Sequence, residues 1–104
     1  MKSVTFVKDG VAQFPDAVTK RGAKHAIALK KLVERGKGAG ILFVCQRPDA
    51  TLFRPMWERD PKLAQSVLDA KKQGVKIWCI TLNISETEMT FDKEIPVNLE
   101  LQNI

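Results

Sequence analysis

The stretch AGILFVCQ, residues 39–46, decides the fold class of this chain. It is a continuous apolar run of strand length, and such runs are typical of a central strand that is covered on both faces. The run is far shorter than the roughly 18 apolar residues that a membrane-spanning helix needs. Segments with a helical spacing of apolar residues precede and follow it, which implies crossover connections over the sheet. The expected class is therefore α/β with a mixed sheet.

The segment at the start of the chain predicts a β-hairpin. Residues 2–8 alternate polar and apolar side chains and are rich in β-branched residues, as strands are. Asp9-Gly10 is a strong signal for a two-residue turn, and residues 11–14 return as a second strand. Pro15 and Asp16 then close the hairpin.

Two segments predict helices. Apolar residues recur at helical spacing from about Val18 to Arg35, and they do so again from Leu63 to Leu68. Residue types that favour helix ends stand at the boundaries of both segments. The residues expected at the ends are Asp16 or Thr19 and then Gly36 for the first helix, and Asp60, Pro61 and Gly74 for the second.

The second half of the chain adds further strands. Residues 47–59 are expected to form a long loop, residues 75–84 a long strand, and residues 88–92 its hairpin partner. Residues 95–101 predict a short edge strand or a tail. The expected order is ββαβαββ, in a single domain that covers residues 1–104.

Composition places the chain among globular proteins. Hydrophobic residues make up 44% and charged residues 28%, so the chain is apolar enough to form a core. The first ten residues lack the features of a secretory signal peptide, and the expected location is the cytosol. Cys45 and Cys79 lie inside apolar runs, apart from any Cys/His cluster, which favours reduced core thiols over a disulfide or a zinc site.

Positive charge is concentrated in the first half of the chain. The net charge is +5, but residues 1–47 hold ten Lys/Arg against three Asp/Glu, whereas residues 48–104 hold seven against nine. On a regular first helix, four cations fall on one stripe opposite the apolar stripe: Lys20, Lys24, Lys31 and Arg35. Such a stripe could follow a phosphate backbone, but spacing alone favours a solvated helix face.

Four further side chains invite interpretation. His25 lies in the middle of the apolar stripe, and a core histidine that faces the sheet and bonds a backbone carbonyl is the favoured interpretation. The alternative is a supporting role beside a functional site. Trp57 and Phe53 are expected to pin the long loop to the core, with stacking on exposed bases as the alternative. Trp78 is expected in the core itself. No nucleophile–base pair or glycine-rich phosphate loop is evident.

Three segments, in register, resemble the C-terminal half of the sugar fermentation stimulation protein (SfsA) family. They are FPDAVTKRGAKH at 14–25, LFVCQRPDATLFRP at 42–55, and DPKLAQSVLDAKKQGVKIW at 60–78. The resemblance covers roughly residues 2–99. The residues that match the family's motifs are Thr19, Arg21, Gly22, Lys24, His25, Gln46, Arg47, Asp49, Ala50, Phe53, Pro55, Asp60 and Pro61.

This resemblance implies a PD-(D/E)xK nuclease-like fold, a restriction-endonuclease-like three-layer sandwich of a mixed sheet and helices. In that fold an Asp and a Glu hold a divalent metal, and a Lys two residues after the Glu helps to position the attacking water. Lys2 matches the motif lysine, with Met1 in place of the middle residue, so both acids would lie before Met1. The chain is therefore expected to be a truncated relative without the family's N-terminal OB-like module. Mg²⁺ is implied only for a complete family site.

The resemblance implies a DNA-binding domain that is catalytically incomplete. Lys2 and Gln46 are the expected catalytic remnants, with Gln46 facing the phosphate site from the end of the central strand. The cations expected to bind DNA, weakly and without sequence preference, are Lys20, Arg21, Lys24, Lys31, Arg35, Arg47 and Arg54. For Arg47, an ion pair with Asp49 is the plainer alternative. For the whole domain, the alternative is a structural or regulatory protein-interaction domain with no nucleic-acid role.

Overall fold

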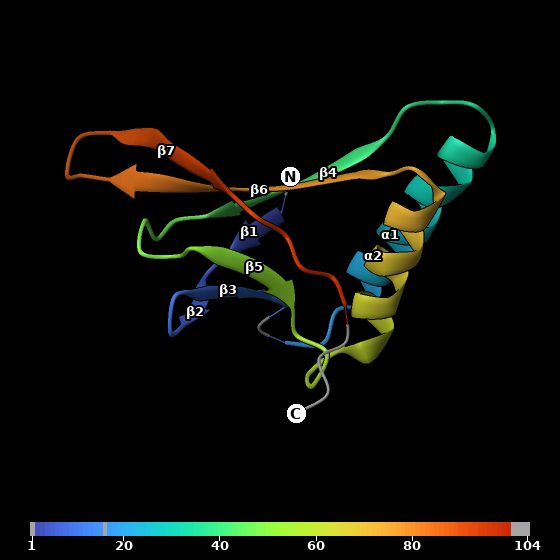
Figure 1. The fold of residues 1–104 in the computed structure, drawn as a ribbon, viewed down its shortest axis with the longest axis horizontal. Helices are drawn as coiled ribbons and strands as arrows, with labels where there is room; N and C mark the ends of the chain where they lie inside the picture. The colour runs from blue at the N-terminus through green and yellow to red at the C-terminus, as the bar shows by residue number, and fades with distance from the viewer. Residues whose placement is uncertain (1, 16, 101–104) are drawn as a thin grey trace.

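A computed structural model describes residues 2–15 and 17–100 of the chain (Figure 1). Its elements confirm the predicted α/β class. They are β1 Lys2–Val4, β2 Phe6–Lys8, β3 Val11–Phe14, α1 Lys20–Glu34, β4 Gly40–Cys45, β5 Leu52–Pro55, α2 Pro61–Gln73, β6 Lys76–Ile84 and β7 Met89–Ile95. In the described part of the chain, neither helix has the length and apolar character that crossing a membrane requires.

β4 is a central strand, as its apolar sequence predicts. It pairs in parallel with β1 on one side and with β6 on the other, and β7 adds antiparallel to β6. The order in this four-stranded sheet is β1-β4-β6-β7. Phe43 of β4 stands in register with Lys2 of β1 and with Cys79 of β6. The first strand of the chain therefore runs directly beside the central strand.

A second, three-stranded sheet contains a strand that was predicted as loop. The predicted single strand over residues 2–8 is divided into β1 and β2, which belong to different sheets, so only β2 forms the hairpin with β3 across Asp9 and Gly10. β5 pairs in parallel with β3. Residues 52–55 do alternate in burial, because Phe53 and Pro55 are buried while their neighbours are half-buried. Arg54 and Pro55 within this segment hide that alternation from sequence reasoning. Pro55 is compatible with a strand because β5 lies at the edge of the three-stranded sheet.

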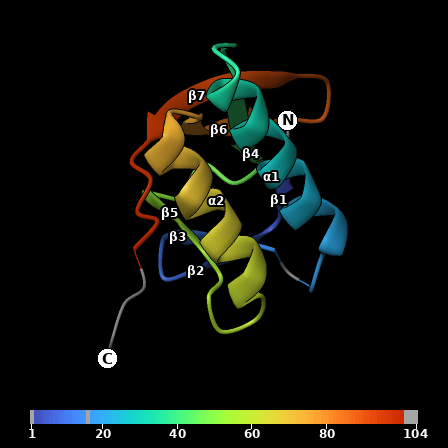
Figure 2. The same ribbon diagram turned by 90° about the vertical axis from the view of Figure 1, so that its right-hand side faces the viewer.

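The two helices lie side by side on one side of the molecule (Figures 1 and 2). Thr19, one of the two predicted caps, is the N-cap of α1. Val18, which was counted in the helical pattern, therefore lies before the helix with 64% of its surface exposed. The other candidate cap, Asp16, lies outside the described residues. α2 has the predicted bounds, with Asp60 as N-cap and with Gly74 at a φ of 113° as C-cap.

An aromatic cluster joins the two sheets. The ring of Phe43 on β4 stacks on the ring of Phe53 on β5, with 4.4 Å between the centroids, and the ring of Phe14 on β3 lies 5.4 Å from Phe43. Cys45 and Cys79 are buried free thiols, as predicted. Burial raises the pKa of the Cys79 thiol to about 12. Both thiols therefore belong to the core.

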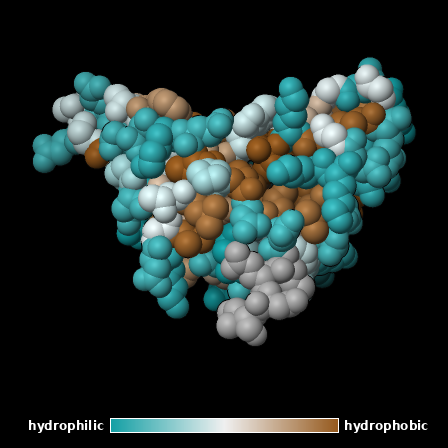
Figure 3. All heavy atoms as spheres, viewed as in Figure 1, coloured by the Kyte–Doolittle hydropathy of each residue, from teal (hydrophilic) through white to brown (hydrophobic). Residues whose placement is uncertain are grey.

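The hairpin of β6 and β7 extends beyond the helices and the second sheet (Figure 1). Trp78 on β6 is 41% exposed, so its predicted place in the core is wrong: successive strand residues face opposite sides, and Cys79 is the buried one. Farther along the hairpin, Ile84, Met89 and Phe91 are each more than half exposed. On the face of the molecule in Figure 3, hydrophobic residues gather in the middle and hydrophilic residues along the margins.

The buried carboxylate of Asp60 connects the starts of both helices. Asp60 is only 4% exposed. Its Oδ1 accepts a hydrogen bond from the backbone N–H of Leu63 at 3.1 Å, which caps α2. Its Oδ2 accepts from the backbone N–H of Thr19 at 2.9 Å, and the Thr19 hydroxyl in turn accepts from the N–H of Gly22 at 3.0 Å. One carboxylate thus caps α2 and holds the capping residue of α1.

We predict that Asp60→Ala lowers the free energy of unfolding by about 2–4 kcal/mol, because it removes a helix cap and leaves the N–H groups of Leu63 and Thr19 without their acceptor. Urea denaturation followed by circular dichroism measures the loss. Asp49→Ala is the matched control, since it removes a carboxylate whose ion pair is exposed, and it should leave stability almost unchanged. Equal losses in the two variants would contradict the bridging role of Asp60.

Candidate anion-binding site

A depression of about 490 Å³ lies between the start of β1 and the first turns of α1. It is lined by Lys2 from β1 and by Arg21, Lys24 and His25 from α1. Three of these side chains are cations, the fourth can become one, and none of the lining residues described by the structure carries a carboxylate. The depression therefore has the chemistry of an anion-binding site.

The fold brings these four side chains together from two parts of the chain. Residues three and four apart on a helix are neighbours, so Arg21, Lys24 and His25 form one continuous surface on α1. Lys2 reaches the same depression because β1 lies at the edge of the four-stranded sheet, beside β4. The cap of α1 on Thr19, itself held by Asp60, sets where this surface begins.

The start of α1 concentrates positive charge. The first N–H groups of a helix carry a partial positive charge, and Asp or Glu usually offsets it. In α1 the first turn holds no acidic residue, whereas Lys20 and Arg21 add full positive charges there. Like charges at this end weaken the isolated helix, but together with the helix dipole they favour an anion at its N-terminus.

His25 is exposed, so the expectation of a core histidine is wrong. The buried positions on α1 are Gly22, Ala23 and Ala26, and His25 lies just outside that face, beside the depression. Partial desolvation lowers the pKa of His25 below its ordinary value of 6.5, and the positive charges of Lys2 and Arg21 lower it further. The imidazole is therefore largely neutral at pH 7.

The rest of the predicted cationic stripe continues along α1. Lys20, Lys24 and Lys31 are exposed, and Arg35 follows the helix as an exposed C-cap residue. This placement matches the predicted stripe opposite the buried face. The role of these residues in binding nucleic acid stays a prediction.

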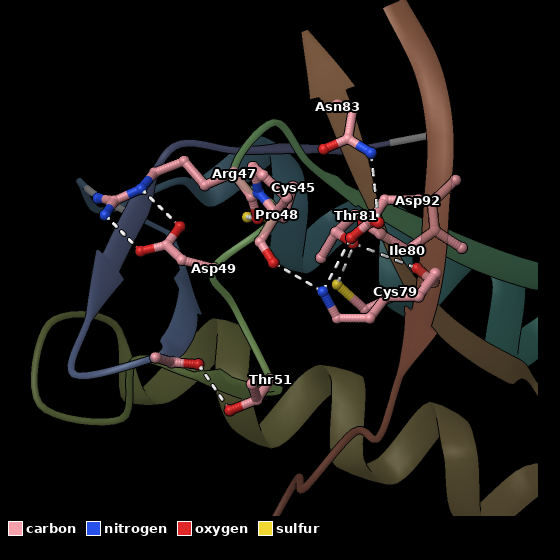
Figure 4. Close-up of polar contacts among 12 residues, drawn as sticks. Cys45, Arg47, Pro48, Asp49, Thr51, Cys79, Ile80, Thr81, Asn83 and Asp92 are labelled. Atoms are coloured by element: carbon pink, nitrogen blue, oxygen red, sulfur yellow. Dashed lines mark hydrogen bonds and ion pairs between the residues drawn. The ribbon is translucent and has the colours of Figure 1, made fainter.

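Two arginines of the predicted interface are engaged within the protein. Arg47 forms an ion pair with Asp49, at 2.7 Å between Nη2 and Oδ2, as the plainer alternative had it (Figure 4). This contact holds the pKa of the Asp49 carboxyl below its ordinary value. Arg54 donates to Glu58 at 3.0 Å and to the side chain of Gln13 at 3.4 Å, and its side chain is only 14% exposed. Neither arginine lines the depression around Lys2.

Sequence reasoning missed a polar cluster that connects the loop between β4 and β5 to the β6–β7 hairpin (Figure 4). The buried Thr81 hydroxyl donates to Asp92 at 2.8 Å, and Lys93 Nζ donates both to Asp92 at 2.8 Å and to the carbonyl oxygen of Pro48 at 2.6 Å. The Lys93 and Thr81 hydrogen bonds hold the pKa of Asp92 below its ordinary value. A buried threonine in an apolar strand was the available signal. Thr81 stands in register with Lys93, and the register shift that follows leaves Asp92 as an extra residue beside it, which leaves no trace in the sequence.

Gln46 does not join the depression. It follows β4 at an exposed position, and it is absent from the lining of the depression. Successive strand residues face opposite sides, so Gln46 continues the side of Val44 rather than that of Phe43, with which Lys2 stands in register. Its predicted catalytic role stays a prediction.

The residues that line the depression are not suited to bind a divalent cation. Mg²⁺ and Ca²⁺ prefer oxygen ligands and carboxylates above all, whereas Lys2, Arg21 and Lys24 would repel them. Within residues 2–15 and 17–100 there is also no cluster of three or more His, Cys, Asp or Glu side chains that could hold a metal ion. The chemistry that these residues support is the binding of an anion.

Comparison with known proteins identifies a family whose members are similar to this chain. The model of the family described as "Sugar fermentation stimulation protein RE domain" matches residues 1–88. A sugar fermentation stimulation protein homolog of Methanobrevibacter smithii is 48% identical over 83 residues, which are 80% of this chain and 35% of the homolog. A homolog of Desulforamulus reducens is 39% identical over 99 residues, which are 95% of this chain and 41% of the homolog.

A solved structure is similar as well. "The structure of Pyrococcus Furiosus SfsA in complex with Ca2+" superposes with a TM-score of 0.89 at 32% sequence identity, over 93% of this chain and 42% of that one. This match agrees with the nuclease-like sandwich that the motifs imply. The chain spans about two fifths of the length of these relatives.

We predict that Gly22→Ala destabilises the protein, although Ala normally stabilises a helix by about 0.5–1 kcal/mol relative to Gly. A Cβ at position 22 would lie 2.9 Å from Cγ2 of Thr19 and 3.2 Å from Cδ1 of Leu63, so the cap or the helix pair must shift. The expected loss is about 1–2 kcal/mol in urea denaturation. Gly38→Ala, where a Cβ meets nothing within 4 Å, is the control and should be neutral. A more stable Gly22→Ala variant would show that close packing does not constrain this site.

Proposed function

Because the chain belongs to the sugar fermentation stimulation protein (SfsA) family, we propose that it binds nucleic acid, most readily DNA, through backbone phosphates. The depression around Lys2 takes one phosphate, and the exposed cations of α1 take its neighbours along the strand. Binding of this kind is electrostatic and indifferent to base sequence. Its expected strength is that of non-specific contacts, on the order of 10⁻⁴–10⁻⁶ M at physiological salt.

One observation carries this proposal. Lys2, Arg21 and Lys24 converge on a depression at the N-terminal end of a helix, where carboxylates would be the stabilising choice. Ion pairing within the depression does not account for this placement, because the lining that the structure describes contains no carboxylate. A phosphate in the depression would offset the repulsion among the three cations.

The relation to nuclease chemistry rests on the family. The matching family model describes an "RE domain", and the Pyrococcus furiosus relative is described as a complex with Ca²⁺. In the PD-(D/E)xK pattern Lys2 would be the motif lysine, which stabilises charge that develops on a phosphate. A metal would require carboxylates that the depression does not offer. We therefore propose that the 104-residue chain binds nucleic acid without cutting it.

A second candidate function has its own observation. The β6–β7 hairpin exposes Ile84, Met89 and Phe91, and exposed apolar side chains that lie near one another are typical of protein–protein contacts. A protein-interaction domain would use this hairpin rather than α1. The two candidates therefore depend on different surfaces, and substitutions on α1 separate them.

The first test replaces Lys20 and Lys24 together by Ala. If α1 contacts phosphates, log affinity for duplex DNA falls linearly with log salt, and the variant's slope is shallower by about one for each lost contact. Fluorescence anisotropy from 20 to 200 mM salt measures both slopes on two unrelated duplexes. Lys71→Ala with Lys72→Ala is the matched control, since it removes two exposed lysines from the last turn of α2.

We expect the α1 variant to weaken binding to both duplexes alike and the α2 variant to leave the slope unchanged. The absence of binding to DNA and RNA even at 20 mM salt would refute the proposal. A strong preference for one duplex would also refute it, since phosphate contacts carry no sequence information.

The second test asks whether the chain cuts DNA. Supercoiled plasmid is incubated with the 104-residue chain and with Lys2→Ala, each with Mg²⁺ or Mn²⁺. We expect no cleavage by either, together with weaker plasmid binding by Lys2→Ala, because that variant removes one of the cations in the depression. Metal-dependent cutting that Lys2→Ala abolishes would show instead that this chain completes a catalytic site.

A further inference from the structure

His25 has the means to do more than line the depression. It is the single histidine of the chain, and it shares the depression with Lys2, Arg21 and Lys24. Unlike those three side chains, an imidazole changes its charge between pH 5 and 8. Its neutral form offers a phosphate one N–H donor, whereas its protonated form offers two donors and a positive charge. The protonation state of His25 therefore decides how well the depression binds a phosphate.

The surroundings of His25 hold it neutral while the depression contains no anion. Partial desolvation and the charge of Lys2 lower its pKa, with further contributions from the chain's amino terminus and from Arg21. Lys24 is the remaining charged side chain of the lining, and none of the lining residues that the structure describes carries an acidic group that would oppose these cations. A phosphate among these side chains reverses the balance, because an anion within about 4–6 Å favours the protonated imidazole.

We propose that His25 is a further phosphate-binding residue of this site and that it binds in its protonated form, so that each phosphate that enters the depression is accompanied by one proton. This inference rests on the proposed function and adds that pH regulates the binding of nucleic acid. The affinity for nucleic acid rises as the pH falls from about 8 toward 5.5. With one coupled proton, the rise cannot exceed tenfold per pH unit.

The direct test is an NMR titration of the His25 imidazole, whose signals need no assignment because the chain has one histidine. The probe is a short DNA duplex with hydroxyl groups at all ends, since a terminal phosphate titrates near pH 6 and would obscure the result. We expect the pKa of His25 to lie below 6.5 in the free protein and to rise by about one unit or more in the saturated complex. The titration is restricted to pH 5.0–7.0, where the amino terminus stays charged.

Two variants connect this protonation to affinity. In His25→Gln, the affinity for the same duplex should no longer rise between pH 7.0 and 5.5. In Lys31→Gln, which removes a cation outside the depression, affinity should weaken by a similar factor at every pH and keep its pH dependence.

The outcomes separate the two proposals. If binding is independent of pH and the pKa of His25 is unchanged in the complex, phosphate binding is not coupled to protonation of His25. That result overturns this inference and leaves the proposed function intact. A pH dependence that persists in His25→Gln overturns it as well, because another group then takes up the proton. The absence of binding at pH 5.5 and 20 mM salt overturns the proposed function and this inference with it.

Discussion

The bridging carboxylate of Asp60 is the interaction on which the arrangement of helices and site depends. A buried carboxylate is costly unless its oxygens accept hydrogen bonds, and here they accept from the N–H groups of Leu63 and Thr19. Those two groups belong to the starts of two helices, so the cost of burial is offset only when both helices start in their observed places. The hydrogen bond from Thr19 to Asp60, the capping residue of α2, therefore fixes the position of the N-terminus of α1 and of its cations.

This constraint explains how the protein tolerates a charge arrangement that a lone helix would resist. The first turn of α1 holds cations without an acid, against the helix dipole. Stability then has to come from packing: Ala23 and Ala26 are buried, and Gly22 brings α1 close to Leu63 of α2. Positive charge that would destabilise an isolated helix is thereby held beside Lys2 of β1, where it is available to an anion.

Much of the fold follows from local sequence signals, whereas the site does not. The apolar run of β4, the Asp9-Gly10 turn and the caps at Thr19, Asp60 and Gly74 were predicted because each depends on a few neighbouring residues. The exceptions depend on distant partners. β5 is a strand because β3 lies beside it. His25 looked like a core residue on a helical wheel, but how far the buried face extends depends on where α2 packs. Likewise, Lys2 meets Arg21 only through the pairing of β1 with β4.

The central claim is that a phosphate binds where the Asp60-held start of α1 meets β1. The most direct measurement is a titration of the ¹⁵N-labelled chain with a short DNA duplex, followed by the backbone N–H signals at low salt. The account predicts that the largest shifts fall in Lys2–Val4 and in residues 19–26, and that residues 83–91 of the hairpin change little. Shifts that are largest in the hairpin, with the start of α1 unaffected, would contradict it.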